Sequence, residues 1–99
     1  MALALQWNTS AIASFDKTVV YLENEWGINA AIRFVRKVNH ILFLLQSYPE
    51  IGRPENPKTD LFSVVIIHQT TLFYRMKSDK IILLMFFDTR RSPARRPKQ

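Results

Sequence analysis

Five basic side chains in the second half of the chain could bind phosphate or another anionic group: Arg53, Arg75, Lys77, Arg90 and Arg91. Guanidinium groups suit this chemistry because they make paired hydrogen bonds to phosphate oxygens. The cations sit in a loop, on a predicted strand and after a final strand. In an antiparallel sheet the start of one strand lies beside the end of its neighbour. We therefore expect these side chains to converge on one patch.

Histidine is the natural candidate for proton transfer near neutral pH. His68 lies between two predicted strands, at a hairpin turn where it is either an exposed turn residue or a catalytic group. His40 lies between apolar positions of a predicted helix, and we expect it to be structural. The sequence has no Gly-rich phosphate loop, no histidine pair at metal spacing and no serine in a nucleophile-elbow context. We therefore expect no cofactor and no metal.

The positive charge of the chain is concentrated at its C-terminal end. The net charge is +6, from 14 basic and eight acidic side chains. Five of the basic residues follow Thr89, where no acidic residue occurs, so the remaining nine exceed the acidic residues by only one. Such a local excess indicates a polyanion or an acidic protein as partner, the alternative being a solvated tail that only aids solubility.

A short strand and two helices are expected in the first half of the chain, where they must support the candidate functional residues. Leu3, Leu5 and Trp7 alternate with smaller or polar residues and predict a short strand. Apolar residues then recur at steps of three and four on two segments: Ile12, Phe15, Val19, Leu22 and Trp26 on the first, and Ala31, Phe34, Val38, Ile41 and Leu45 on the second. Asn8, Thr9 or Ser10 could cap the first helix and Asn29 the second. Gly27 ends the first helix, so the two should form an antiparallel hairpin.

Three strands are expected in the second half, after a loop. Residues 47–60 hold three of the five prolines and one of the two glycines, so we expect no regular structure there. Residues 61–67, 70–76 and 80–87 are strand-like and separated by short turns, which predicts an antiparallel meander. The last strand is apolar on both faces, so we place it centrally in the sheet. Arg75 and Lys77 share one side of their strand, opposite Tyr74.

The expected fold is a single α+β domain in the order β-α-α-β-β-β, with the helical hairpin packed on an antiparallel sheet. A chain of 99 residues that is 47% hydrophobic suits one packed domain. We assign residues 1–93 to this domain and residues 94–99 to a basic flexible tail, which has no apolar residue beyond one alanine. The chain has no cysteine, no signal-like N-terminus and no apolar run near the roughly 20 residues of a membrane span. We therefore expect a cytoplasmic protein that does not enter a membrane.

Four motifs, in order along nearly the whole chain, resemble the RelE/ParE superfamily of bacterial toxins. They are Trp26-Gly27-x-x-Ala30-Ala31-x-x-Phe34, Pro49-x-x-Gly52-Arg53, Leu72-Phe73-Tyr74-Arg75 and Phe87-Asp88-Thr89-Arg90-Arg91-x-Pro93. The resemblance implies a type II toxin that an acidic or amphipathic antitoxin holds inactive. It also implies one of two targets. RelE-like members cut messenger RNA in the ribosome, whereas ParE-like members inhibit DNA gyrase and are not nucleases.

The resemblance does not choose between these targets, because a shared fold does not fix a function. Cutting needs a group that accepts the proton of the 2′-hydroxyl, cations for the phosphate and an acid for the leaving oxygen. Nuclease members often carry a tyrosine or histidine near the C-terminus and a basic residue at the opening of the second strand. This chain has neither feature, so His68, Tyr74 and Asp88 remain as the candidate catalytic residues.

Other classes of function compete with the toxin. The main alternative is a non-toxic nucleic-acid or ribosome-binding module that uses the basic C-terminal patch. A winged helix-turn-helix is disfavoured because neither predicted helix has the basic exposed face that reads a major groove, and the first carries Asp16, Glu23 and Glu25. A small acyl-transfer or phosphate enzyme is disfavoured because no nucleophile–base pair is evident.

Overall fold

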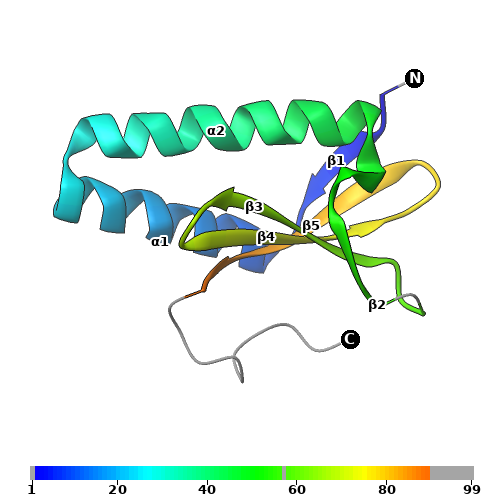
Figure 1. Ribbon diagram of the computed structural model, residues 1–99. Coiled ribbons are helices and arrows are strands. Elements are labelled where there is room, and N and C mark those ends of the chain that lie inside the picture. The colour runs from blue at the N-terminus through cyan, green and yellow to red at the C-terminus, as the bar shows by residue number, and fades with distance from the viewer. Residues whose placement is uncertain (1, 57, 90–99) are drawn as a thin grey trace.

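A computed structural model describes residues 2–56 and 58–89. The first strand, β1 (Ala4–Trp7), leads into helix α1 (Thr9–Trp26), and helix α2 (Ile28–Ser47) follows after Gly27 alone. Asn8 caps α1, because its side-chain oxygen accepts a hydrogen bond from the Ala11 backbone N–H at 2.9 Å. Gly27 has a φ of 91°, a conformation that favours glycine. The expected helical hairpin is confirmed (Figure 1), but Asn29 is not a cap, because α2 already begins at Ile28.

The sheet has five strands in the order β1-β5-β4-β3-β2. Strands β3 (Leu61–Ile67), β4 (Thr70–Met76) and β5 (Lys80–Asp88) form the expected antiparallel meander. β5 lies between β4 and β1, so its interior position is confirmed. β1 pairs with β5 in parallel, which makes the sheet mixed rather than antiparallel. The parallel pairing is possible because the long helical hairpin separates β1 from the rest of the sheet in the chain.

The segment 47–60, predicted to be irregular, is partly ordered into secondary structure. A short 3₁₀ helix, η1 (Pro49–Ile51), is followed by strand β2 (Arg53–Asn56), which pairs with β3 at the edge of the sheet. An edge strand tolerates Pro54, because a proline without an N–H need not donate to a second neighbour. The register of β2 shifts between Pro54 and Asn56. The prediction failed because turn-forming residues also suit a short, irregular edge strand.

The main hydrophobic core lies between the helices and one face of the sheet. Trp7, Phe15, Phe34 and Phe86 meet there, with ring centroids 5.5 to 6.3 Å apart. A bulge between the pairs Phe73–Met85 and Tyr74–Leu83 lets β5 turn both Leu83 and Phe86 toward the helices. His40, which we expected to be structural, is exposed on α2 and is not part of the core. The proposed tail, residues 94–99, lies outside the described residues.

No described helix is long and apolar enough to span a membrane. The two helices cover the β3–β4–β5 region of the sheet, and the tip of the helical hairpin reaches past the turn between β3 and β4 (Figure 1). The fold therefore has two surfaces on which functional residues could gather. One is the sheet face opposite the helices, called here the helix-free face. The other runs beneath the projecting tip of the helical hairpin.

Candidate functional site

The helix-free face brings together two of the predicted phosphate-binding arginines. Arg53 on β2 pairs with Ser63 on β3, and Arg75 on β4 pairs with Leu61 on β3. Paired residues point to the same face of a sheet, so both arginines share the side opposite the main core. With one strand between them and an offset of two residues, their Cα atoms lie about 12 Å apart. This spacing would let the two guanidinium groups contact one extended ligand together.

Arg75 is held in place by the loop that precedes β3. One guanidinium nitrogen, Nη1, donates to the backbone oxygen of Thr59 at 2.6 Å. Next to it, Lys77 Nζ lies 3.7 Å from a carboxylate oxygen of Asp60. A guanidinium group carries five N–H donors, so Arg75 keeps donors for a ligand after this bond is made. Lys77 is largely exposed and its pair with Asp60 is solvated, so it contributes little rigidity.

Tyr74 precedes Arg75 on β4, and its side chain lies on the opposite side of the sheet, toward the main core. Its side chain is buried, stacks on Phe62 at 5.6 Å and donates through its hydroxyl to the Pro49 carbonyl at 2.8 Å. Burial raises the pKa of Tyr74 to about 12, although a hydrogen bond from the Gly52 backbone N–H acts in the other direction. The hydroxyl thus ties the Pro49–Gly52 segment to the sheet, and Arg53 follows that segment directly.

Gly52 is required by this arrangement. A Cβ atom at this position would overlap the Tyr74 hydroxyl and come within 2.8 Å of the Ser63 backbone oxygen. The glycine of the Pro-x-x-Gly-Arg motif is therefore explained by close packing on Tyr74, since its φ of −74° is one that any residue adopts. We call this contact between Tyr74, Pro49 and Gly52 the tyrosine clamp.

A second hydrophobic cluster occupies the middle of the helix-free face. Leu61, Phe73 and Phe87 are buried there, and Leu84 and Met85 pack against them. These residues lie between Arg75 and the end of β5. The centre of this face is therefore apolar, with Arg53 and Arg75 beside it. The face also carries the Glu55 carboxylate, which accepts a hydrogen bond from the Ser63 hydroxyl at 2.5 Å.

His68, in the β3–β4 turn, and Asp88, at the end of β5, both lie beside the start of β4. Thr70 pairs with Asp88, and Thr89 donates to the Gln69 carbonyl through its N–H at 3.0 Å and to the His68 carbonyl through its hydroxyl at 3.3 Å. His68 is exposed at the β3–β4 turn. Tyr74 lies four residues from Thr70, about 13 Å along the strand, and faces the core. The structure therefore brings His68 near Asp88 but does not bring Tyr74 to them.

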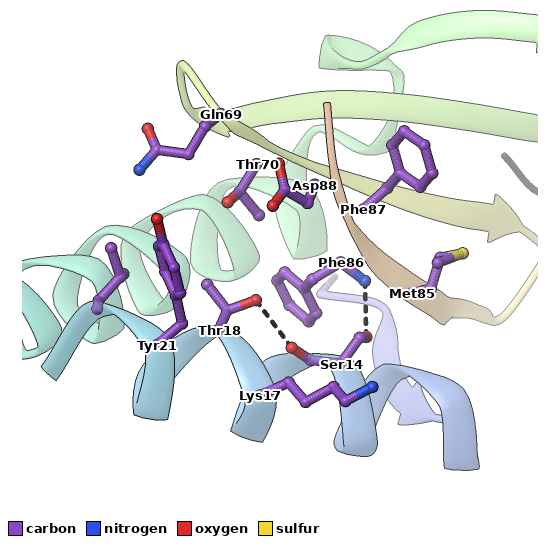
Figure 2. Close-up of a pocket in the computed structure, with 11 residues that line it drawn as sticks. Ser14, Lys17, Thr18, Tyr21, Gln69, Thr70, Met85, Phe86, Phe87 and Asp88 are labelled. Atoms are coloured by element: carbon purple, nitrogen blue, oxygen red, sulfur yellow. Dashed lines mark hydrogen bonds between the residues drawn. The ribbon is translucent and has the colours of Figure 1, made fainter. Parts of the chain in front are cut away.

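Asp88 borders a groove of about 400 Å³ between α1 and the end of β5. Figure 2 shows Lys17 and Tyr21 on the helix side of this groove, with Thr70 and Asp88 on the sheet side. The floor is fixed by Ser14, whose hydroxyl accepts a hydrogen bond from the Phe86 backbone N–H at 2.9 Å (Figure 2). Asp88 thus lies on the helix side of the sheet, away from Arg53 and Arg75.

The structure describes three of the five cations that were predicted to converge. Arg53 and Arg75 share a face, and Lys77 follows Arg75 by two residues, just after the end of β4. This end of β4 is about 20 Å from the end where Asp88 and Thr89 lie. Arg90 and Arg91 lie outside the described residues. Antiparallel pairing does place strand ends side by side. It places the end of β5, however, beside the start of β4 and not beside Lys77.

A basic surface on α2 was missed. Arg33, Arg36 and Lys37 are exposed, and the helix contains no acidic residue, so the expectation that neither helix has a basic face was wrong. Among residues 2–56 and 58–89, none of these three cations forms an ion pair. The absence of acidic residues from 28–47 was the signal that could have revealed this surface. In the same part of the chain, no group of three or more His, Cys, Asp or Glu side chains could hold a metal ion.

Comparison with known families assigns the fold. The family model for the ParE toxin of the type II toxin–antitoxin system parDE matches residues 5–93. This chain belongs to the ParE toxin family. It is accordingly the toxin component of a type II toxin–antitoxin system, and the resemblance to the RelE/ParE superfamily is confirmed. No curated protein sequence matches the chain.

Solved structures share the fold at low sequence identity. The chromosomal ParDE toxin–antitoxin system of P. aeruginosa has a chain with a TM-score of 0.71 and 20% identity, covering 88% of this chain and 96% of that one. The YoeB/ParE toxin of Agrobacterium tumefaciens gives 0.64 and 15%, covering 87% and 98%. The YoeB dimer of Staphylococcus aureus gives 0.63 and 17%, covering 88% and 97%. ParE and YoeB toxins thus share this architecture.

The tyrosine clamp predicts coupled effects of two substitutions on stability. We expect Tyr74→Phe to lower the free energy of unfolding by about 1–2 kcal/mol, because the Pro49 carbonyl and the Gly52 N–H lose a buried partner. Gly52→Ala should cost more, because its new methyl group overlaps the hydroxyl. In the double variant part of that cost should be relieved, giving a coupling of about 1 kcal/mol in urea unfolding. Strictly additive losses would show that the hydroxyl does not constrain Gly52.

Proposed function

We propose that this toxin arrests growth by binding and inhibiting DNA gyrase, without cutting messenger RNA. The observation that carries the proposal is the separation of the candidate proton-transfer groups. Ribosome-dependent cutting needs an acceptor and a donor on either side of one phosphate. Tyr74 is buried with its hydroxyl engaged by Pro49, and burial keeps its pKa far above neutral, so it neither reaches a substrate nor ionises.

The membership of the ParE family supports the same target, since ParE-like toxins act on gyrase. His68 and Asp88 stand near one another at one end of the sheet, but Arg53 and Arg75 do not accompany them there. A nuclease centre built on His68 and Asp88 would therefore lack the two fixed arginines. A binding surface has no such requirement, because it needs only complementary charge and shape.

The arginines serve this function as contacts to the target. Arg53 and Arg75 occupy fixed positions beside an apolar cluster on the helix-free face. Arg90 and Arg91 follow directly after Thr89 in the sequence. Leu61, Phe73 and Phe87 are already buried within the chain, so a target would meet the arginines and the partly exposed Leu84 and Met85 around them. Arginine is enriched among the residues that dominate protein interfaces. We assign the cations Arg53, Arg75, Lys77, Arg90 and Arg91 to recognition of the target.

We further propose that a cognate antitoxin, encoded beside this gene, neutralises the toxin by covering its basic surface. The type II family implies such a partner, and the excess of positive charge implies that the partner is acidic. An apolar segment of the antitoxin would supply most of the affinity by leaving water. Its carboxylates would speed and orient association through pairing with Arg75, Arg90 and Arg91.

Substitution of the proton-transfer candidates separates gyrase inhibition from mRNA cutting. We expect His68→Ala and Asp88→Asn to keep full toxicity on induced expression, because binding transfers no proton. Purified wild-type toxin should inhibit DNA supercoiling by gyrase and leave ribosome-bound messages intact. Tyr74→Phe, checked for folding, should remain toxic as well. Message cleavage that falls by orders of magnitude in any of these variants would instead establish a nuclease.

Replacement of the arginines should abolish toxicity whichever target is used. We expect Arg90→Ala with Arg91→Ala to prevent growth arrest, and Arg53→Ala or Arg75→Ala to weaken inhibition of supercoiling by about tenfold or more. Arg36→Ala is the matched control, since it removes one exposed arginine from the opposite layer of the fold. Equal losses in Arg36→Ala and Arg75→Ala would mean that total charge, and not this surface, determines potency.

The rate of association with the antitoxin should fall as salt is added, and Arg75 should be responsible for part of this dependence. In stopped-flow mixing of toxin and antitoxin, we expect Arg75→Gln to slow association about tenfold at low ionic strength, with the difference shrinking as salt is added. Arg36→Gln should change the rate little. A structure of the complex in which Arg75 stays open to solvent would contradict the proposal.

A further inference from the structure

A groove beneath the projecting tip of the helical hairpin has no role in the function proposed above. It measures about 590 Å³, within the usual range for small-molecule sites. Leu22, Phe34, Ile66 and Ile67 make its walls apolar. Trp26 lines it with 70% of the residue's surface exposed, although tryptophan is highly buried on average. Its indole ring offers a planar surface beside the groove on which a flat ligand can stack.

The cations of this groove come from one side of α2. Arg33 and Lys37 both line it, and residues four apart on a helix lie on the same face, about 6 Å apart along the axis. Neither forms an ion pair with another described residue, and no acidic residue lines the groove. The site therefore carries two uncompensated positive charges beside the indole ring, and an anionic group is the complementary ligand.

The sheet side of the groove contributes neutral polar groups. Gln69 and His68 lie at the β3–β4 turn, and both line the groove. An amide both donates and accepts hydrogen bonds, so Gln69 suits the edge of a nucleobase, which presents donors and acceptors together. Stacking aromatics beside a basic groove are the usual means of binding single-stranded nucleic acid. An acidic peptide would use the cations but would need neither the exposed indole face nor the amide.

We propose that this groove binds a nucleotide unit, with Trp26 stacked on the base and Arg33 and Lys37 contacting the phosphate. The unit could be a free nucleotide or one exposed nucleotide of a single strand, since both present the same base and phosphate. This inference goes beyond gyrase inhibition and requires neither gyrase nor the ribosome. It also gives a use to the basic side of α2, which lies in the opposite layer from the helix-free face.

Tryptophan fluorescence tests the proposal, because the chain has only two tryptophans. Trp7 is partly buried against Phe15 and Phe86, with ring centroids 5.5 and 5.7 Å away, so a stacked base reaches Trp26 alone. The full chain is titrated with a thymidine decanucleotide, with ATP and with tripolyphosphate. We expect saturable quenching by the oligonucleotide or by ATP but not by tripolyphosphate. The ratio of the two affinities identifies the source of the nucleotide.

Variants then locate the binding site. Trp26→Phe should remove the quenching, and Arg33→Ala or Lys37→Ala should weaken binding roughly tenfold each, because each loses a charged contact to phosphate. Arg36→Ala is the matched control on the same helix, since Arg36 is exposed but does not line the groove, and it should change the affinity less than twofold. Arg95→Ala with Arg96→Ala tests general attraction by the basic C-terminal residues, and it should leave the quenching in place.

Three results would overturn the proposal. Absence of quenching by any nucleotide at low salt would show that no base stacks on Trp26. Equal weakening in the Arg36 and Lys37 variants would show that only total charge matters. Saturable quenching by polyglutamate but not by the oligonucleotide would show that the groove receives an acidic protein segment. None of these outcomes bears on gyrase inhibition, which the supercoiling assay reports separately.

Discussion

Burial of strand β5 on both faces is the constraint on which the rest of the structure depends. One side of the strand supplies Ile81, Leu83 and Phe86 to the core beneath the helices, and the other supplies Phe87 to the smaller cluster on the helix-free face. A strand that alternated strictly would send Leu83 and Phe86 to opposite faces. The bulge near Leu84 and Met85 removes this conflict. The Ser14 hydroxyl, which accepts from the Phe86 amide, secures α1 against β5 at the same level.

The position of β5 determines where polar residues can gather. With β1 on one side and β4 on the other, the strand fixes β4, and β4 carries both Tyr74 and Arg75 on opposite faces. Tyr74 points toward the main core and bonds to the Pro49–Gly52 segment, and Arg75 points to the helix-free face. Because side chains alternate along a strand, the buried Tyr74 hydroxyl and the half-buried Arg75 guanidinium group lie on opposite faces of the sheet. The tyrosine in the Leu-Phe-Tyr-Arg motif is bonded through its hydroxyl to Pro49, in the segment that precedes Arg53.

The two charged surfaces lie in opposite layers of the fold. The helix-free face carries Arg53 and Arg75 around an apolar centre, and the groove side of α2 carries Arg33 and Lys37 beside an exposed indole. A single ligand of ordinary size cannot contact both, because the sheet and the main core separate them. The proposed protein target and the proposed nucleotide would therefore occupy separate surfaces. In this proposal Trp26, at the turn between the helices, binds a ligand and does not serve the core.

The sequence by itself determined the order of elements apart from η1 and β2, the helical hairpin, the three-stranded meander, the interior position of β5 and the family. These features follow from local signals: apolar residues at steps of three and four, a capping asparagine, a glycine with positive φ and an apolar strand. Tertiary structure alone decided the parallel pairing of β1, the edge strand made by Arg53–Asn56 and the exposure of His40. It also decided that Tyr74 is buried, and that Asp88 on β5 lies beside the start of β4 whereas Lys77 follows the end of β4. These outcomes depend on which strands pair and in which register, because side chains distant in sequence meet only through pairing and packing, which no local pattern encodes.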